Sequence, residues 1–189
     1  MKHIFIFSVI LFELLTSCIN NDLYNSGDLP EANANPNKQK DSLIALLPTM
    51  KADTFDCTAD IYWKIIQRGE TSIPSLIESL TDTRMTNIYD NCKHGKLTVG
   101  EVSYFALQEI TEFPAFLVTH IQFDLVVNNC WNFYDYFFDN KNKQEYQKMV
   151  RDFYNTHKNK KYVFVRYDEQ KLNKCQRLYK IEGKLKWTE

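Results

Sequence analysis

The sequence contains few of the residues from which common catalytic motifs are built. Only five glycines and five prolines occur among the 189 residues, and there is no glycine-rich phosphate loop, dinucleotide-binding fingerprint, GxSxG or HExxH motif. The cysteines and histidines do not occur at the spacings that zinc ligands require. We therefore expect no enzyme, no cofactor and no metal site.

The N-terminus has the organisation of an export signal. Lys2 and His3 form a short basic start before an apolar run at residues 4–15, which has the length of the central region of a signal peptide and is too short to span a bilayer. The run ends in Leu15-Thr16-Ser17-Cys18, which resembles the lipobox of bacterial lipoproteins, an aliphatic residue and two small residues before an acylated cysteine. The resemblance implies that residues 1–17 are a signal peptide and that Cys18 carries the lipid.

The residues that follow Cys18 indicate the location and the reach of the protein. Ile19 and Asn20 lack the aspartate that favours inner-membrane retention of enterobacterial lipoproteins, so the resemblance implies an outer-membrane anchor, on either face. Residues 19–41 are rich in Asn, Pro, Gly, Ser and Asp without an apolar period, which predicts a flexible tether with an average reach of roughly 25 to 30 Å. We therefore divide the chain into signal peptide 1–17, lipidated cysteine and tether 18–41, and a single domain 42–189.

Charge is distributed unevenly along the chain, although the formal net charge is only −1. Residues 42–140 carry 6 basic and 13 acidic side chains, whereas residues 141–189 carry 14 basic and 6 acidic ones. The pattern predicts either attraction between two faces of one domain or a basic region that binds an anionic partner. A nucleic acid is not the expected partner at an envelope location.

Four cysteines follow the anchor, namely Cys57, Cys92, Cys130 and Cys175. An exported chain resides where disulfides form, but four cysteines allow three pairings, and the sequence does not choose among them. The alternative is that these residues are reduced and lie in the core as small apolar side chains.

Two catalytic hypotheses can be drawn from the remaining polar residues. A hydrolase of the envelope would use Cys92 or Cys130 as nucleophile and His94 or His120 as base. A glycosidase would draw a carboxylate pair from residues of the acidic, aromatic stretch, which are Asp124, Asp135 and Asp139. Neither hypothesis has a defining spacing, so we rank both below a binding function.

The hydrophobic period is mainly helical. It predicts a helix at 42–47 with Asp41 as its N-cap, helices at 58–68 and about 71–80, another that begins at a Thr98–Glu101 capping box, and one at 144–158. The residues before Thr98 are expected to form a polar loop, and residues 116–123 a short strand or a buried loop. Residues 69–82 (GETSIPSLIESLTD) resemble the second half of a HEAT-like repeat, and the resemblance implies a helical hairpin array that binds partners on one face. β-forming residues occupy 162–167 and also 178–187, where two short strands around Glu182-Gly183 are expected. The expected fold class is therefore mainly α, a short HEAT-like array with a small C-terminal β hairpin or sheet.

Residues 128–140 (NNCWNFYDYFFDN) place aromatic rings among asparagines and aspartates. Rings bordered by amides and carboxylates are typical of sugar sites, so Trp131, Tyr134 and Tyr136 would offer flat faces while Asp135 and Asn132 would bond hydroxyl groups. The alternative is that these rings anchor the core and satisfy their own polar tips.

These observations favour a lipid-anchored, non-catalytic binding or adaptor module. Its partner would be another envelope component, bound on the HEAT-like face or on the aromatic stretch 128–140. The alternative is a glycan-binding lipoprotein that uses that aromatic stretch.

Overall fold

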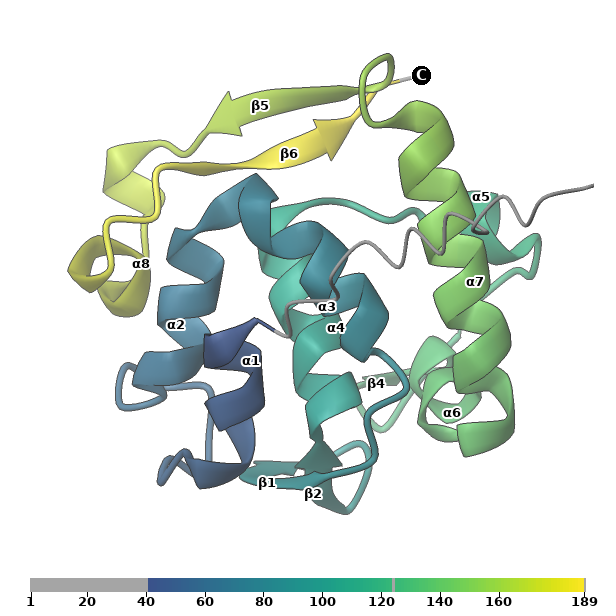
Figure 1. Cartoon of the computed structure of the whole chain (residues 1–189), viewed down its shortest axis with the longest axis horizontal. Coiled ribbons are helices and arrows are strands. Elements are labelled where there is room, and N and C mark those ends of the chain that lie inside the picture. Colours follow the sequence, from purple (N-terminus) through teal and green to yellow (C-terminus); the bar gives the residue numbers. More distant parts are fainter. Residues whose placement is uncertain (1–40, 124, 189) are drawn as a thin grey trace, which may run out of the picture. The chain divides into compact units, whose positions relative to one another are not determined.

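The computed structural model describes residues 41–123 and 125–188 of the chain. The predicted signal peptide, Cys18 and the tether as far as residue 40 lie outside the described residues, and so does Asp124. The described part contains eight α-helices, three 3-10 helices and six short strands (Figure 1). The α-helices are α1 Ser42–Leu46, α2 Asp60–Gln67, α3 Ile73–Ser79, α4 Val99–Ile110, α5 Ala115–Thr119, α6 Phe133–Phe138, α7 Asn140–His157 and α8 Lys174–Leu178. The strands are β1 Met85–Asp90, β2 Gly95–Thr98, β3 Val126–Val127, β4 Cys130–Trp131, β5 Tyr162–Arg166 and β6 Gly183–Trp187, and the 3-10 helices are η1 Leu47–Thr49, η2 Gly69–Ser72 and η3 Glu169–Lys171.

Helix α4 is the centre of the core. Nine of its twelve residues are buried, and α2 and α3 pack directly against it. Figure 1 shows α1 and α2 on one side of α4 and α6 and α7 on the other. Tyr104 of α4 contacts Phe137 of α6 and Tyr146 of α7, at ring-centroid distances of 4.5 and 6.2 Å. A helix buried around most of its circumference is the core of a single packed unit, so the fold is organised around α4.

The start of α4 confirms the predicted capping box. The Thr98 hydroxyl oxygen accepts a hydrogen bond from the Glu101 N–H, and the Glu101 carboxylate accepts one from the Thr98 N–H. Gly100 lies between Thr98 and Glu101, and the backbone of Leu80, the C-terminal cap of α3, approaches it closely. A Cβ at this position would lie 2.2 Å from the Leu80 carbonyl oxygen, so any side chain would push α3 and α4 apart.

Glu101 also forms the centre of a buried charged cluster. Its side chain is fully buried and accepts hydrogen bonds from Lys143 Nζ at 2.6 Å and from Lys93 Nζ at 2.5 Å. Burial raises the pKa of the Glu101 carboxyl, but the hydrogen bonds from Lys143, Lys93 and the Thr98 N–H outweigh burial and hold the pKa below its ordinary value of 4.5. The cluster therefore ties α7 and the β1–β2 turn to the start of α4.

Two disulfides join segments that are distant in the sequence. Cys57, before α2, is bonded to Cys175 of α8, and Cys92, in the β1–β2 turn, is bonded to Cys130 of β4. Of the three pairings that the sequence left open, the structure has this one. The bonds close loops with sequence separations of 118 and 38 residues.

The six strands form three separate antiparallel pairs, β1–β2, β3–β4 and β5–β6. The β5–β6 pair is the most regular, with Tyr162 opposite Trp187 and Arg166 opposite Gly183. Its strand β6 also bridges to Thr111, at the C-terminal end of α4. This bridge fixes the C-terminal sheet to the helical core.

The predicted fold class, a HEAT-like helical hairpin array, is wrong. After α3 the chain enters the β1–β2 hairpin, and α4 is then buried on most of its surface, whereas a helix in a repeat array keeps one face open. Apolar residues at helical spacing occur in every buried helix, so the GETSIPSLIESLTD pattern did not specify a repeat. The C-terminal sheet also differs in its strands, because residues 178–182 complete α8 and a turn, and β6 alone pairs with β5.

Two segments have secondary structure that the sequence did not predict. The region before Thr98, expected to be a polar loop, is the β1–β2 hairpin, whose first strand β1 buries only the alternate residues Thr86 and Ile88. Residues 116–123, expected to be a short strand or a buried loop, contain most of α5. Both elements are too short for their hydrophobic period to be recognised.

Candidate binding surface

A group of exposed apolar side chains surrounds α5 and the segment that follows it. Helix α5 buries Val118 and Thr119 but has only five residues, so its remaining large side chains face outward. Phe116 is 57% exposed, and Leu125 and Val126 are each 65% exposed. We use the name apolar surface for these residues together with their exposed apolar neighbours, which are Leu117, Ile121 and Val127.

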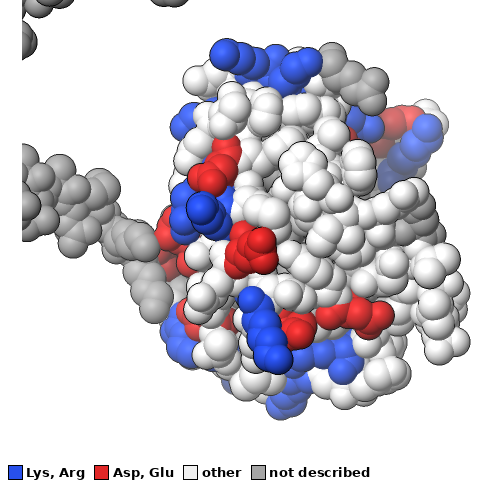
Figure 2. All heavy atoms as spheres, turned by 90° about the vertical axis from the view of Figure 1, so that its right-hand side faces the viewer, with Lys and Arg blue, Asp and Glu red and all other residues white. Residues whose placement is uncertain are grey.

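Figure 2 shows this side of the molecule, with a broad region in which no described residue is a lysine, arginine, aspartate or glutamate. Scattered exposed apolar residues are normal in proteins, but a contiguous group of them marks an interaction site. The β3–β4 hairpin contributes to this because its strand Val126–Val127 has both side chains exposed.

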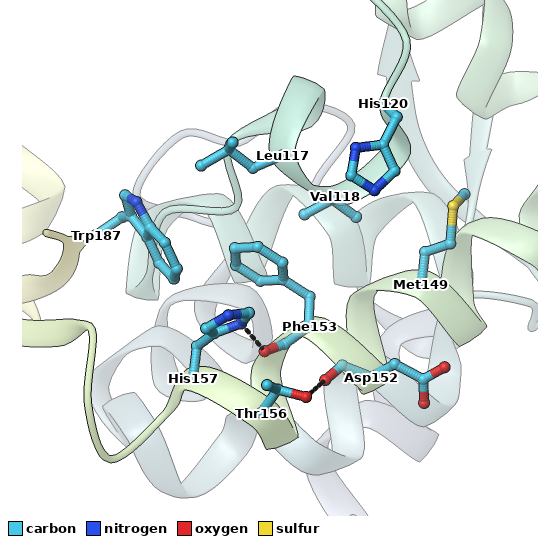
Figure 3. Close-up of a pocket in the computed structure, with 9 residues that line it drawn as sticks. All are labelled: Leu117, Val118, His120, Met149, Asp152, Phe153, Thr156, His157 and Trp187. Atoms are coloured by element: carbon cyan, nitrogen blue, oxygen red, sulfur yellow. Dashed lines mark hydrogen bonds between the residues drawn. The ribbon is translucent and has the colours of Figure 1, made fainter. Parts of the chain in front are cut away.

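A groove of about 500 Å³ adjoins the apolar surface. Its lining comes from α5 with the residue after it, from α7 and from β6, as Figure 3 shows. The apolar lining is Leu117, Val118, Met149, Phe153 and Trp187, and the polar lining is His120, Asp152, Thr156 and His157. An apolar floor with a few polar groups at its margin is the composition of a ligand or peptide groove.

The polar side chains of the groove either form hydrogen bonds within their own helix or point away from one another. His157, the last residue of α7, donates from Nδ1 to the Phe153 carbonyl oxygen at 2.8 Å and lies edge-on to Trp187, with ring centroids 5.0 Å apart. Figure 3 shows the Asp152 carboxylate directed away from His157. Within the described part of the chain, no histidine of the groove forms an ion pair with a carboxylate. The groove therefore has the features of a binding site and lacks an arranged acid–base pair.

The residues proposed for sugar binding pack mainly against one another. The Trp131 indole N–H donates to the Phe123 carbonyl oxygen, and its ring lies 5.0 Å from the ring of buried Phe133. Tyr134 and Tyr136 are half-buried, and Asp135 is exposed. These residues belong to β4 and α6, so they do not line the groove. The sugar-binding hypothesis stays a prediction without a site of its own in the described residues.

The residues of the two catalytic hypotheses are not brought together. Cys92 and Cys130 are bonded to each other, so neither sulfur is free to act as a nucleophile. Asp139 caps α7 by accepting a hydrogen bond from the Lys141 N–H, and Asp124 lies outside the described residues. Among residues 41–123 and 125–188, no group of three or more His, Cys, Asp and Glu side chains is placed to hold a metal ion.

Comparison with known proteins identifies no relative. The chain matches no protein-family model, no curated protein and no solved structure. Within the described part of the chain, no helix combines the length and the apolar character that crossing a membrane requires. The apolar surface was not found from the sequence because α5 and the β3–β4 hairpin are too short to show which side chains face outward.

Proposed function

We propose that the protein is a lipid-anchored envelope protein that binds another envelope protein through the apolar surface and its groove. The observation that supports a binding role is the exposure of large apolar side chains at α5 and at the β3–β4 hairpin, among them Phe116, Leu125 and Val126, together with an apolar groove that α5 itself lines. Exposed apolar groups with aromatic members are typical of the central part of a protein–protein interface.

A protein partner fits this surface better than a charged ligand. The described residues of the apolar surface have no ionisable side chain, and the groove has a single carboxylate, from Asp152. Burial of apolar area is the main favourable term in protein association, whereas a sugar or an anion needs several converging polar groups. The partner would therefore offer an apolar face with few charges at its centre.

A pair of leucine substitutions tests the proposed surface. Leu125→Ser removes an apolar side chain from the surface, and Leu178→Ser removes one of similar exposure, 61% against 65%, from α8. Figure 1 shows α8 and α5 at opposite sides of the described domain. A photo-crosslinking amino acid at position 116 of the full chain, expressed in its own cell envelope, would capture the partner.

We expect one dominant crosslinked protein whose yield falls about tenfold with Leu125→Ser, the loss expected when an apolar anchor worth about 1.4 kcal/mol is removed. The yield with Leu178→Ser should equal that of the unmodified chain. Equal yields with both variants would refute the apolar surface as the binding site.

The anchor is tested separately at Cys18. We expect Cys18→Ala to abolish incorporation of radiolabelled palmitate and to leave residues 1–17 attached, because the lipobox cysteine accepts the lipid. The readouts are labelling and intact mass. A lipid-modified, processed chain in the variant would contradict the lipoprotein assignment.

A further inference from the structure

The β5–β6 sheet has two edges that differ in their hydrogen bonding. The Thr188 N–H donates to the Lys161 carbonyl oxygen, and the Tyr167 N–H donates to the Glu182 carbonyl oxygen. In an antiparallel pair, hydrogen-bonded residues alternate with residues whose backbone groups face away from the partner strand. With the observed register, Val163 and Val165 therefore bond to β6, and the backbone groups of alternate residues face outward.

One outward backbone group of β6 bonds to the helical core, whereas those of β5 have no partner among the described residues. On β6, the Leu185 carbonyl oxygen accepts from the Glu112 N–H at 3.0 Å, next to the bridge with Thr111. On β5, the N–H and carbonyl groups of Tyr162, Phe164 and Arg166 bond to no described backbone group outside the sheet. Figure 1 shows β6 on the side of the helices and β5 on the outer side.

The free edge of β5 lacks two of the features that protect edge strands, since it contains neither a proline nor a bulge. Proteins block such edges with proline, a bulge or a charged residue that points inward. β5 pairs with β6 in continuous register and exposes 49% of Val163, 55% of Phe164 and 37% of Val165. The edge thus offers both unpaired backbone groups and apolar side chains.

The surroundings of β5 are strongly basic. Residues 158–188 contain ten lysines and arginines but only three aspartates and glutamates. Lys184 pairs with Glu112 at 3.1 Å, but Lys160, Lys161 and Arg166 form no ion pair with any described residue. An added strand that carries negative charge would neutralise these side chains.

We propose that the free edge of β5 binds an extended, acidic segment of a partner protein, which adds to the sheet as a third strand. Backbone hydrogen bonds to Tyr162, Phe164 and Arg166 would hold the segment, and its carboxylates would select the basic surroundings. A second copy of this chain is a poorer occupant, because its β5 would bring a second basic region to the same place. This site is distinct from the apolar surface, and either proposal can fail alone.

The first test measures binding of synthetic peptides to the full, lipidated chain in detergent. The acidic probe is a nine-residue peptide in which glutamates alternate with valine and threonine. The controls are the same peptide with lysine in place of glutamate and the same peptide with alternate backbone nitrogens methylated. We expect the acidic probe to bind about tenfold more tightly than either control, and to weaken as salt is raised. Equal affinity of the methylated and unmethylated peptides would overturn the proposal.

The second test uses amide hydrogen exchange and needs no variant. In the free chain, the Val163 and Val165 amides should exchange slowly and the Phe164 amide quickly. The acidic probe should slow exchange at Phe164 about tenfold or more. A Phe164 amide that is already protected without peptide would overturn the proposal, since another segment or a second copy would then occupy the edge.

Two variants separate this site from the apolar surface. Phe164→Pro removes an outward N–H and costs no bond to β6, so it should lower the affinity for the acidic probe about tenfold. Leu125→Ser should leave that affinity unchanged. If Leu125→Ser alone weakened the peptide, the β5 site would be refuted; if Phe164→Pro alone reduced crosslinking at position 116, the apolar surface would be refuted.

Discussion

Replacement of Glu101 with glutamine tests the buried charged cluster. The substitution keeps the shape of the side chain and leaves an amide oxygen that can accept the Thr98 N–H bond. It removes the negative charge that faces the two ammonium groups of Lys143 and Lys93. The Lys143 side chain is only 4% exposed, and its remaining polar partner is Asn140 Oδ1 at 3.1 Å.

The magnitude follows from the burial of Lys143. Removal of one partner from a buried ion pair costs about 3 to 5 kcal/mol, because the other charge is left without compensation. In the variant, Lys143 keeps its hydrogen bond to Asn140, and Lys93 is partly exposed. We therefore expect Glu101→Gln to lower the free energy of unfolding by about 3 kcal/mol, near the lower end of this range. This is a large part of the free energy of unfolding of a typical domain, about 5 to 15 kcal/mol.

The assay is urea denaturation at pH 7 followed by circular dichroism, with both disulfides intact. For a slope of about 2 kcal/mol per molar urea, the midpoint should fall by about 1.5 M. The matched control is Glu112→Gln, which removes the partner of Lys184 at a half-exposed ion pair and should cost less than about 1 kcal/mol. Equal midpoints for the two variants would refute the assignment of a stabilising buried charge to Glu101.

The pH dependence of the free energy of unfolding provides an independent check of the Glu101 carboxyl. The pKa of the Glu101 carboxyl is lowered in the folded state, so the folded chain binds this proton less readily than the unfolded chain does. The stabilisation is therefore present above the ordinary pKa of 4.5 and is lost as the pH falls through the folded pKa. We expect the difference between wild type and Glu101→Gln to shrink as the pH is lowered from 7 to 3, and a constant difference would contradict this explanation.

Three further substitutions test the packing. Gly100→Ala should lower the free energy of unfolding by more than about 2 kcal/mol, because the added Cβ meets the Leu80 carbonyl oxygen just after α3. The control Gly95→Ala, whose added Cβ has its nearest atom at 4.0 Å, should change that free energy by less than about 1 kcal/mol. Similar thermal midpoints for the two variants would exclude the close approach of α3 and α4. Replacement of both Cys57 and Cys175 by serine opens a loop with a sequence separation of 118 residues. The free energy of unfolding, measured by urea denaturation, should fall by about 2 to 5 kcal/mol. An unchanged urea midpoint would argue against this pairing. Leu76→Asp places a carboxylate at a fully buried position and should leave the chain unfolded by circular dichroism; a folded variant would show that this site tolerates charge.

The sequence by itself determined the elements whose signals are local. Asp41 caps α1 through the Leu43 N–H, and Thr98 with Glu101 caps α4, both as expected. The long amphipathic helix is present as α7, four residues longer at its start than the predicted bound of 144. Capping groups and side chains one helical turn apart interact wherever the helix lies in the fold, so a single sequence is enough to find them.

Tertiary structure alone decided the features that join distant residues. The pairing of Cys57 with Cys175, the contact of Glu101 with Lys143 and the open edge of β5 depend on how the elements pack, and no spacing in the sequence encodes them. The apolar surface has the same origin, since Phe116 and Leu125 are indistinguishable in sequence from core residues. A short element does not show which of its sides is buried until the rest of the chain has packed against it, and both proposed binding sites lie on such elements.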